Sequence, residues 1–302
     1  MKPLLTTLLT AFSVLGIAAP SAWAQAGTKR IETPIRTPVV RNPSPLAGAP
    51  VLAPLNQALP PTQLSAPAVQ VQSRPFNLDT ALARLLADLK AVTATGEFEL
   101  SITNADKVEV TTLPLVLHLM EGRVRTELDL RSVPTRVDPP GPFTMLRGAG
   151  ITRIVTLSMA SVGVRLTHQI FPEARAYTTQ ELPDEDIPAL IKLEKRTLGP
   201  EPSNPQLEQF QATLSFTNGE KREARVWQTI GADPQPAQIQ FDVGFSRITI
   251  RIRALQSLAD SRSPEGAQQN ATLFQIPSDY TKHSDVGYLL QTFSVRRIRA
   301  LR

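Results

Sequence analysis

The chain has 302 residues, no cysteine and a formal net charge of +5. The lack of cysteine excludes disulfides, thiolate metal sites and thiol nucleophiles, so the fold must be stabilised by a hydrophobic core. Lys2 and residues 25–75 carry all of the excess positive charge. In the remaining residues the positive and negative charges are equal in number. Because a nucleic-acid-binding domain needs a basic face, we expect no nucleic-acid partner.

Residues 1–24 predict a cleavable signal peptide. Lys2 is followed by the apolar run Leu4–Ala19 and by the small-residue cleavage site Ala22-Trp23-Ala24. This run is shorter than the roughly 20 apolar residues of a transmembrane helix. No cysteine follows it that could carry a lipid, so we expect a mature protein that is free in the periplasm or otherwise exported.

Residues 25–75 predict a disordered linker or arm. They contain ten of the 27 prolines and carry a net charge of +4. Proline removes backbone donors and favours extended, solvated chain. The basic arm could rest on an anionic membrane surface, and a solubilising tail without a partner is an equally good interpretation. A folded domain is expected over residues 76–302.

The folded part begins with an amphipathic helix and continues with strands. Leucines recur at intervals of three and four over residues 77–92, with Asn77 as the expected N-cap. Residues 96–103 alternate as a strand, and residues 113–120 and 123–131 form a hairpin through Glu121-Gly122.

The stretch 143–179 is expected to form the centre of the sheet. After a short helical turn at 143–150, apolar and polar residues mix at a period of about two, which is typical of half-buried antiparallel strands. Two long strands are predicted, with a short third strand after Pro172.

The C-terminal part predicts a short helix at 184–193 and two more hairpins. Residues 207–216 and 223–230 flank Asn218-Gly219, for which a type I′ turn is expected. The second hairpin pairs 238–243 with 246–255, where an arginine row could bind phosphate or form a solvated outer face. A helix at 283–290 and a basic strand or tail at 293–301 complete the prediction.

In total, the sequence predicts about ten strands and two or three helices. The one strong helix precedes the strands, so the fold class is α+β with an antiparallel sheet rather than repeated βαβ units.

No catalytic motif is present. His118 and His168 lie within predicted strands, where a structural histidine is the more common case, and no metal-ligand spacing or Gly-rich phosphate loop occurs. Asp184, Glu185 and Asp186 are better explained by a capped helix N-terminus than by a cation site. We therefore expect no enzyme, metal or cofactor, although a hydrolase with dispersed carboxylates is left open.

Several phrases of the sequence resemble a known family. They are LPLVLHLMEGRVRTELDL, ITRIVTLSMASVGVRLTHQIFPEARAYTT, the hairpin around Trp227 and FQIPSDY at 274–280. Together they resemble exported bacterial domains of unknown function that are related to the outer-membrane lipoprotein carriers LolA and LolB. The resemblance covers about residues 77–292.

The resemblance implies a strongly curved antiparallel half-barrel, closed by helices around an apolar cavity that holds acyl chains. On this basis the expected function is an exported binding protein for a lipid or an acylated protein. The alternative is an envelope scaffold or sensor with a filled interior and a partner-docking arm. For the first function, the inward rows of the strands predict the lining residues Leu128, Leu130, Ile154, Leu214, Val226 and Ile250.

Overall fold

The computed structural model describes residues 76–104, 107–135, 141–161, 164–182, 187–258 and 263–300. The predicted signal peptide and proline-rich arm lie outside the described residues, as does the acidic cluster at 184–186.

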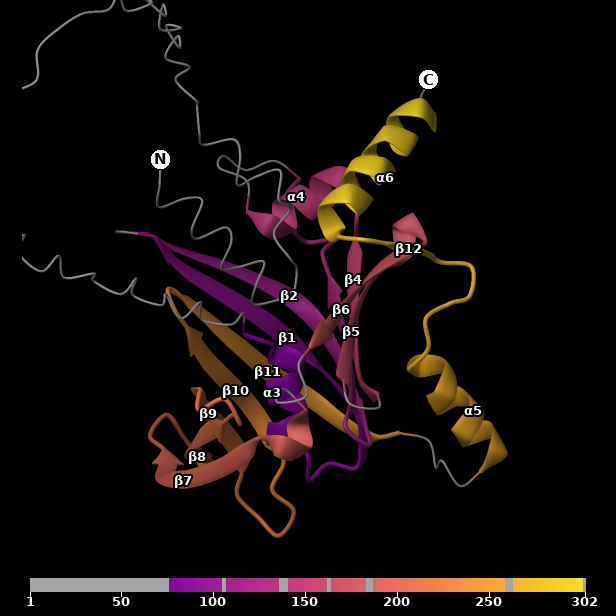
Figure 1. Ribbon diagram of the computed structural model, residues 1–302. Coiled ribbons are helices and arrows are strands. Elements are labelled where there is room, and N and C mark those ends of the chain that lie inside the picture. The colour runs from indigo at the N-terminus through magenta and orange to yellow at the C-terminus, as the bar shows by residue number, and fades with distance from the viewer. Residues whose placement is uncertain are drawn as a thin grey trace, which may run out of the picture. The chain divides into compact units, whose positions relative to one another are not determined.

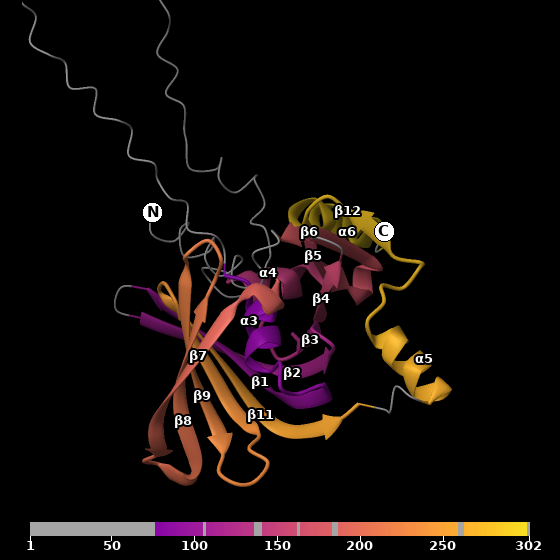
Figure 2. The same cartoon turned by 60° about the horizontal axis from the view of Figure 1, so that its bottom comes forward.

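Twelve strands form a single open sheet in the order β12-β6-β5-β4-β3-β2-β1-β11-β10-β9-β8-β7. The sheet is strongly curved, and its two ends do not meet (Figure 1, Figure 2). All neighbours are antiparallel except β12 and β6, so the predicted α+β half-barrel is confirmed. The strands are β1 (Ala91–Asn104), β2 (Lys107–Met120), β3 (Arg123–Asp129), β4 (Arg153–Ser161), β5 (Val164–Phe171), β6 (Ala176–Leu182), β7 (Lys192–Glu201), β8 (Asn204–Ser215), β9 (Lys221–Thr229), β10 (Pro236–Val243), β11 (Ser246–Ser257) and β12 (Thr281–His283).

Three helices contribute to the hydrophobic core on the inner face of the sheet, which we define as the face that carries Phe98, Leu128 and Ile250. Helix α3 (Leu78–Leu85) lies in the hollow of the sheet (Figure 2) and buries Leu82 in the main hydrophobic cluster. Helix α4 (Pro142–Ala149) packs Phe143 edge-on against Phe98, with ring centroids 6.4 Å apart. Helix α6 (Val286–Ala300) adds Val286 and Leu289.

The opposite, outer face has a smaller core of its own. Phe274, directly after helix α5 (Pro264–Leu273), is buried in a cluster with Met120, Val155, Leu157 and Ile170. Elsewhere the outer face carries charged residues that alternate with the buried positions, as in β3. None of the helices in the described ranges has the length and apolar character needed to cross a bilayer.

The first helix is shorter than predicted. It ends at Leu85, and residues from Ala91 onward belong to β1, where Ala91 pairs with Met120 of β2. The expected cap is confirmed, because the Asn77 side chain accepts a hydrogen bond from the Thr80 backbone N–H at 2.8 Å. In the extended conformation, Ala91 and Val92 pair with Met120 and Leu119 of β2.

The type I′ turn was predicted at the wrong hairpin. Glu121 and Gly122 both have positive φ values, +50° and +76°, as a two-residue type I′ turn requires. In the β8–β9 hairpin, Gly219 has a positive φ of +85° but Asn218 does not. The Phe216 N–H instead donates to the Glu220 carbonyl, so this loop is longer.

The C-terminal predictions require four corrections. Between Ile187 and Ile191 there is only the 3₁₀ turn η3 (Pro188–Leu190), and the unpredicted strand β7 follows it. β7 was missed because it is a mostly exposed edge strand without apolar alternation. Helix α5 was also missed, and α6 continues to Ala300 where a basic strand or tail was expected.

Candidate functional site

The six residues predicted to line a cavity all lie on the inner face. Each is at most 3% exposed, and all belong to the same hydrophobic cluster. Leu128 pairs with Ile154 across β3 and β4, while Ile250 pairs with Ile239, which in turn pairs with Val226. Leu214 and Leu130 are fully buried in the same cluster. Their role as ligand contacts stays a prediction.

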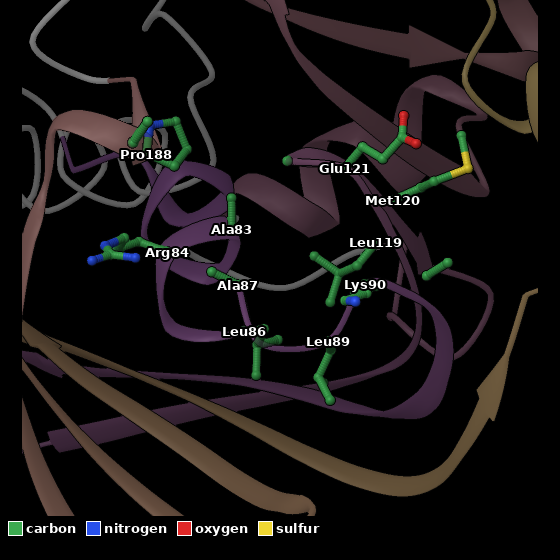
Figure 3. Close-up of a pocket in the computed structure, with 13 residues that line it drawn as sticks. Ala83, Arg84, Leu86, Ala87, Leu89, Lys90, Leu119, Met120, Glu121 and Pro188 are labelled. Carbon is green, nitrogen blue, oxygen red and sulfur yellow. The ribbon is translucent and has the colours of Figure 1, made fainter.

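A cavity of about 510 Å³ lies next to this cluster (Figure 3). It is bounded by the C-terminal half of α3, the link to β1, the β2–β3 turn and η3. Its volume is within the range of small-molecule pockets. Its lining is mostly apolar and includes none of the six predicted residues: Ala83, Arg84, Leu86, Ala87, Leu89, Lys90, Ala91, Leu119, Met120, Glu121, Gly122, Pro188 and Ala189.

Cationic side chains outnumber anionic ones around this cavity. Arg84 and Lys90 line it, and the Arg84 Nε donates to the Ile191 carbonyl at 2.7 Å, which ties α3 to the start of β7. The anionic lining residue, Glu121, forms an ion pair with Arg123 at 3.0 Å. The cavity therefore combines apolar walls with a positive local charge.

A buried arginine lies on the inner face of β5, directly behind the β2–β3 turn. Arg165 is 0% exposed. Its Nε donates to the Ser158 Oγ at 2.7 Å, and its Nη2 donates to the Gly122 carbonyl at 3.2 Å. Its Nη1 has no hydrogen-bond partner among the described residues. Burial lowers the pKa of Arg165 to about 10, so the side chain remains cationic at neutral pH.

A buried carboxyl group on α3 interacts with this arginine. Asp79 accepts a hydrogen bond from the Thr126 Oγ1 at 2.9 Å. Burial raises the pKa of Asp79 to about 6, although the Thr126 hydrogen bond and the charge of Arg165 both act in the opposite direction. Ala83 lies four residues after Asp79 on α3, so the Asp79 face of the helix continues into the cavity wall.

Sequence reasoning did not single out Asp79 and Arg165 as a pair. Asp79 lies in the first turn of the helix, where acidic residues are common, and Arg165 belongs to a strand in which polar residues occur on both faces. The alternation of Arg165, Thr167 and Gln169 with Leu166, His168 and Ile170 could have placed these polar side chains on one face. It could not have shown that this face is the buried one.

The remaining candidates contact neighbouring side chains on the outer face. His118 and His168 lie on the outer face. The Nδ1 of His118 lies 2.9 Å from the Thr93 hydroxyl, and the Nδ1 of His168 lies 3.0 Å from the Thr179 hydroxyl. Burial lowers the pKa of both histidines. The arginine row of β11 forms ion pairs on the outer face, Arg247 with Asp242, Arg251 with Glu99 and Arg253 with Glu97. In the part of the chain that the structure describes, no three His, Asp or Glu residues are placed to hold a metal ion.

No protein-family profile matches this chain, and no curated protein matches its sequence significantly. Solved structures are similar to it at low identity. A putative outer membrane lipoprotein-sorting protein domain from Vibrio parahaemolyticus is 12% identical over 65% of this chain and 97% of its own, with a TM-score of 0.30. A DUF1329 family protein from Desulfovibrio piger is 11% identical over 65% and 97%, with a TM-score of 0.32.

A third similar structure is the Mycobacterium tuberculosis lipoprotein LppX, at 10% identity over 57% of this chain and 91% of its own, with a TM-score of 0.27.

Proposed function

We propose that this protein is an exported, non-catalytic binding protein that holds an acyl chain of a lipid or of an acylated protein. The observation that carries the proposal is the apolar cavity between α3 and the β2–β3 turn. Its large apolar lining residues are Leu86, Leu89, Leu119 and Met120.

Burial of an acyl chain in such a cavity needs no catalytic group. Each buried methylene contributes about 0.8 kcal/mol, so even part of a chain provides useful affinity.

The alternative, a scaffold or sensor with a filled interior, is favoured by one observation. The middle of the inner face is packed, since the six predicted lining residues and Leu82 of α3 form one buried cluster. In that case the cavity beside α3 is a surface hollow, and the basic arm is the part that meets a partner.

Native mass spectrometry of the protein purified from its exported fraction tests the proposal, with lipid extraction of any adduct. We expect a copurifying lipid or acylated peptide, or uptake of a fluorescent fatty acid by the lipid-free protein. A bare mass together with no uptake would contradict the proposal and favour the scaffold.

The cavity itself is tested by filling it. Ala87 lies at its exposed rim, so Ala87→Trp places an indole in the cavity with little effect on the core. We expect fatty-acid uptake to fall at least about tenfold, which corresponds to about 1.4 kcal/mol of binding free energy. The matched control is Ala267→Trp on the exposed surface of α5, which should leave uptake unchanged. Equal uptake by both variants would show that the ligand binds elsewhere.

A further inference from the structure

We propose that the cavity beside α3 binds an amphiphile with an anionic end, and that Lys90 at the mouth of the cavity binds its carboxylate or phosphate oxyanion. This inference rests on the proposed function and deepens it, because it names the chemistry of the ligand's polar end and the residue that recognises it.

The lining of the cavity changes from buried and apolar to exposed and partly charged. The buried lining residues, which we call the floor, are Ala83, Leu86, Leu119, Met120 and Pro188. The exposed lining residues, which we call the mouth, are Ala87, Lys90, Glu121, Gly122 and Ala189. Contact with the floor stabilises an acyl chain, whereas a charged end keeps its hydration only at the mouth. The cavity therefore matches an amphiphile better than a wholly apolar ligand.

The backbone of Lys90 is fixed at the mouth. Lys90 directly precedes Ala91, the first residue of β1, which pairs with Met120. The Lys90 carbonyl accepts a hydrogen bond from the Glu121 N–H at 3.3 Å, so this lysine is tied to the β2–β3 turn. Its side chain lines the cavity and is exposed (Figure 3). The ammonium can therefore contact a ligand at the mouth without displacing a buried group.

The acids near the mouth are paired with cations that do not line the cavity. Glu121 forms an ion pair with Arg123 at 3.0 Å. Asp88, two residues before Lys90, forms an ion pair with Lys195 at 3.5 Å. These four charges offset one another, so they leave the charges of the other cavity residues uncompensated.

Two cations that line the cavity make its local charge positive. The first is Arg84, whose Nε donates to the Ile191 carbonyl at 2.7 Å, and the second is Lys90. A positive potential favours an anionic end over a neutral or cationic one. Lys90 is the better residue for a test, because its replacement keeps the bond by which Arg84 ties α3 to the start of β7.

The test compares three probes that share a saturated 12-carbon chain: laurate, dodecyl phosphate and dodecanol. Displacement of a fluorescent fatty acid from the full chain measures their affinities at about pH 8, where both acids are ionised. We expect the preferred anion to bind about three- to tenfold more tightly than dodecanol, the range for one or two ion pairs at an exposed rim. The anion that binds more tightly identifies the source of the oxyanion, a fatty acid or a phosphate-bearing lipid.

The variant Lys90→Gln should reduce this preference, and Lys90→Glu should reverse it. We expect Lys90→Gln to weaken binding of the preferred anion about threefold or more and to leave dodecanol binding within about twofold. The matched control is Lys107→Gln, which removes the same charge from an exposed position at the opposite end of β2. An equal loss of anion binding in both lysine-to-glutamine variants would overturn the role of Lys90.

The salt dependence of binding provides a second measurement. An ion pair at an exposed mouth is screened by salt, so the advantage of the anion over dodecanol should shrink between about 0.02 M and about 0.5 M sodium chloride. Lys90→Gln should lose most of this salt dependence, and Lys107→Gln should keep it. A salt dependence that is the same in Lys90→Gln and the unmodified protein would contradict the inference.

The failure of this inference and that of the proposed function can be told apart. If dodecanol binds as well as both anions and Lys90→Gln changes nothing, the inference is wrong and the acyl-chain function stands. If none of the three probes binds, the proposed function itself fails.

Discussion

At the scale of single residues, the carboxyl group of Asp79 is the most perturbed acid whose surroundings the structure defines. Its pKa is raised from 3.8 to about 6 because the ionised form is buried, and the contact with Thr126 only partly offsets this cost. The folded state therefore binds a proton more tightly than the unfolded state. The contribution of Asp79 to stability is complete below about pH 4 and is lost as the pH rises through 6.

The variant Asp79→Asn should remove this pH dependence. Two pKa units correspond to about 3 kcal/mol, so the free energy of unfolding of the variant relative to the unmodified protein should rise by about that amount between pH 4 and pH 8. Urea unfolding of both proteins across this range measures the difference, and other titrating groups cancel in it. A difference that does not change with pH would contradict the assignment.

The positions of the six predicted lining residues show what can and cannot be predicted for single residues from the sequence. Alternation within each strand correctly placed Leu128, Ile250 and the others on the buried face, because side-chain direction has a period of two. Alternation carries no information about where the helices leave space. The cavity instead lies between α3 and the β2–β3 turn, and its lining residues are far apart in the chain.

At the scale of elements, the pairing of β1 with β11 joins the two parts of the sheet. Strands β1–β6 and β12 lie on one side of this junction, and β7–β11 lie on the other. The register shifts between Thr95 and Gly96. A Cβ atom on Gly96 would lie 1.9 Å from the Arg251 carbonyl oxygen, so the two backbones approach closely only because this residue is glycine.

Replacement of Gly96 by alanine should therefore push β1 away from β11 at this junction. The obstructing atoms belong to the backbone and cannot rotate away, so we expect a loss of at least about 3 kcal/mol in the free energy of unfolding. Gly148→Ala is the control, since its new Cβ would meet only the Thr135 carbonyl at 3.6 Å and α4 favours alanine. Similar urea midpoints for the two variants would show that the junction tolerates a side chain.

Two parts of the phrases that carry the family resemblance, IFPEARAY and FQIPSDY, meet in space at the edge of the sheet. IFPEARAY includes η1 (Pro172–Ala174), and FQIPSDY follows α5. The Thr281 N–H, directly after the second phrase, donates to the Arg175 carbonyl at 2.9 Å, and Tyr177 and Tyr280 pack on the same outer-face cluster. These phrases maintain the scaffold, which explains why they indicate the fold and no ligand contacts.

Phe274 is the anchor of this outer-face cluster. The Arg123 guanidinium lies 5.4 Å from its ring centroid, and Arg125 donates to the neighbouring Leu273 carbonyl. We expect Phe274→Ala to cost about 3–5 kcal/mol and to increase amide hydrogen exchange first in α5. The control Phe245→Ala changes a phenylalanine that is 72% exposed, and its effect should stay within about 0.5 kcal/mol. Unchanged exchange in α5 would show that another contact holds the helix.

At the scale of the whole sheet, the sequence predicted the type of fold better than the number and bounds of its strands and helices. The hairpins and the central strands were predicted because each carries an alternating pattern next to a turn signal. β7, α5 and α6 were missed or misassigned because their sequences lack such a pattern, and they gain their structure from neighbours that are distant in the chain. The class of the fold depends on the first group.

The separation of the two sheet edges has a mechanical consequence. In a closed barrel, the strand number and the stagger of the strands fix the diameter. Here β12 and β7 end the sheet without pairing with each other, so no such closure condition applies. A small change of twist at each of the strand pairs can open or tighten the curve while every ladder hydrogen bond is kept. The curvature of the sheet is therefore set by the packing of α3 and the other buried residues on its inner face, and not by a closed ring of strands.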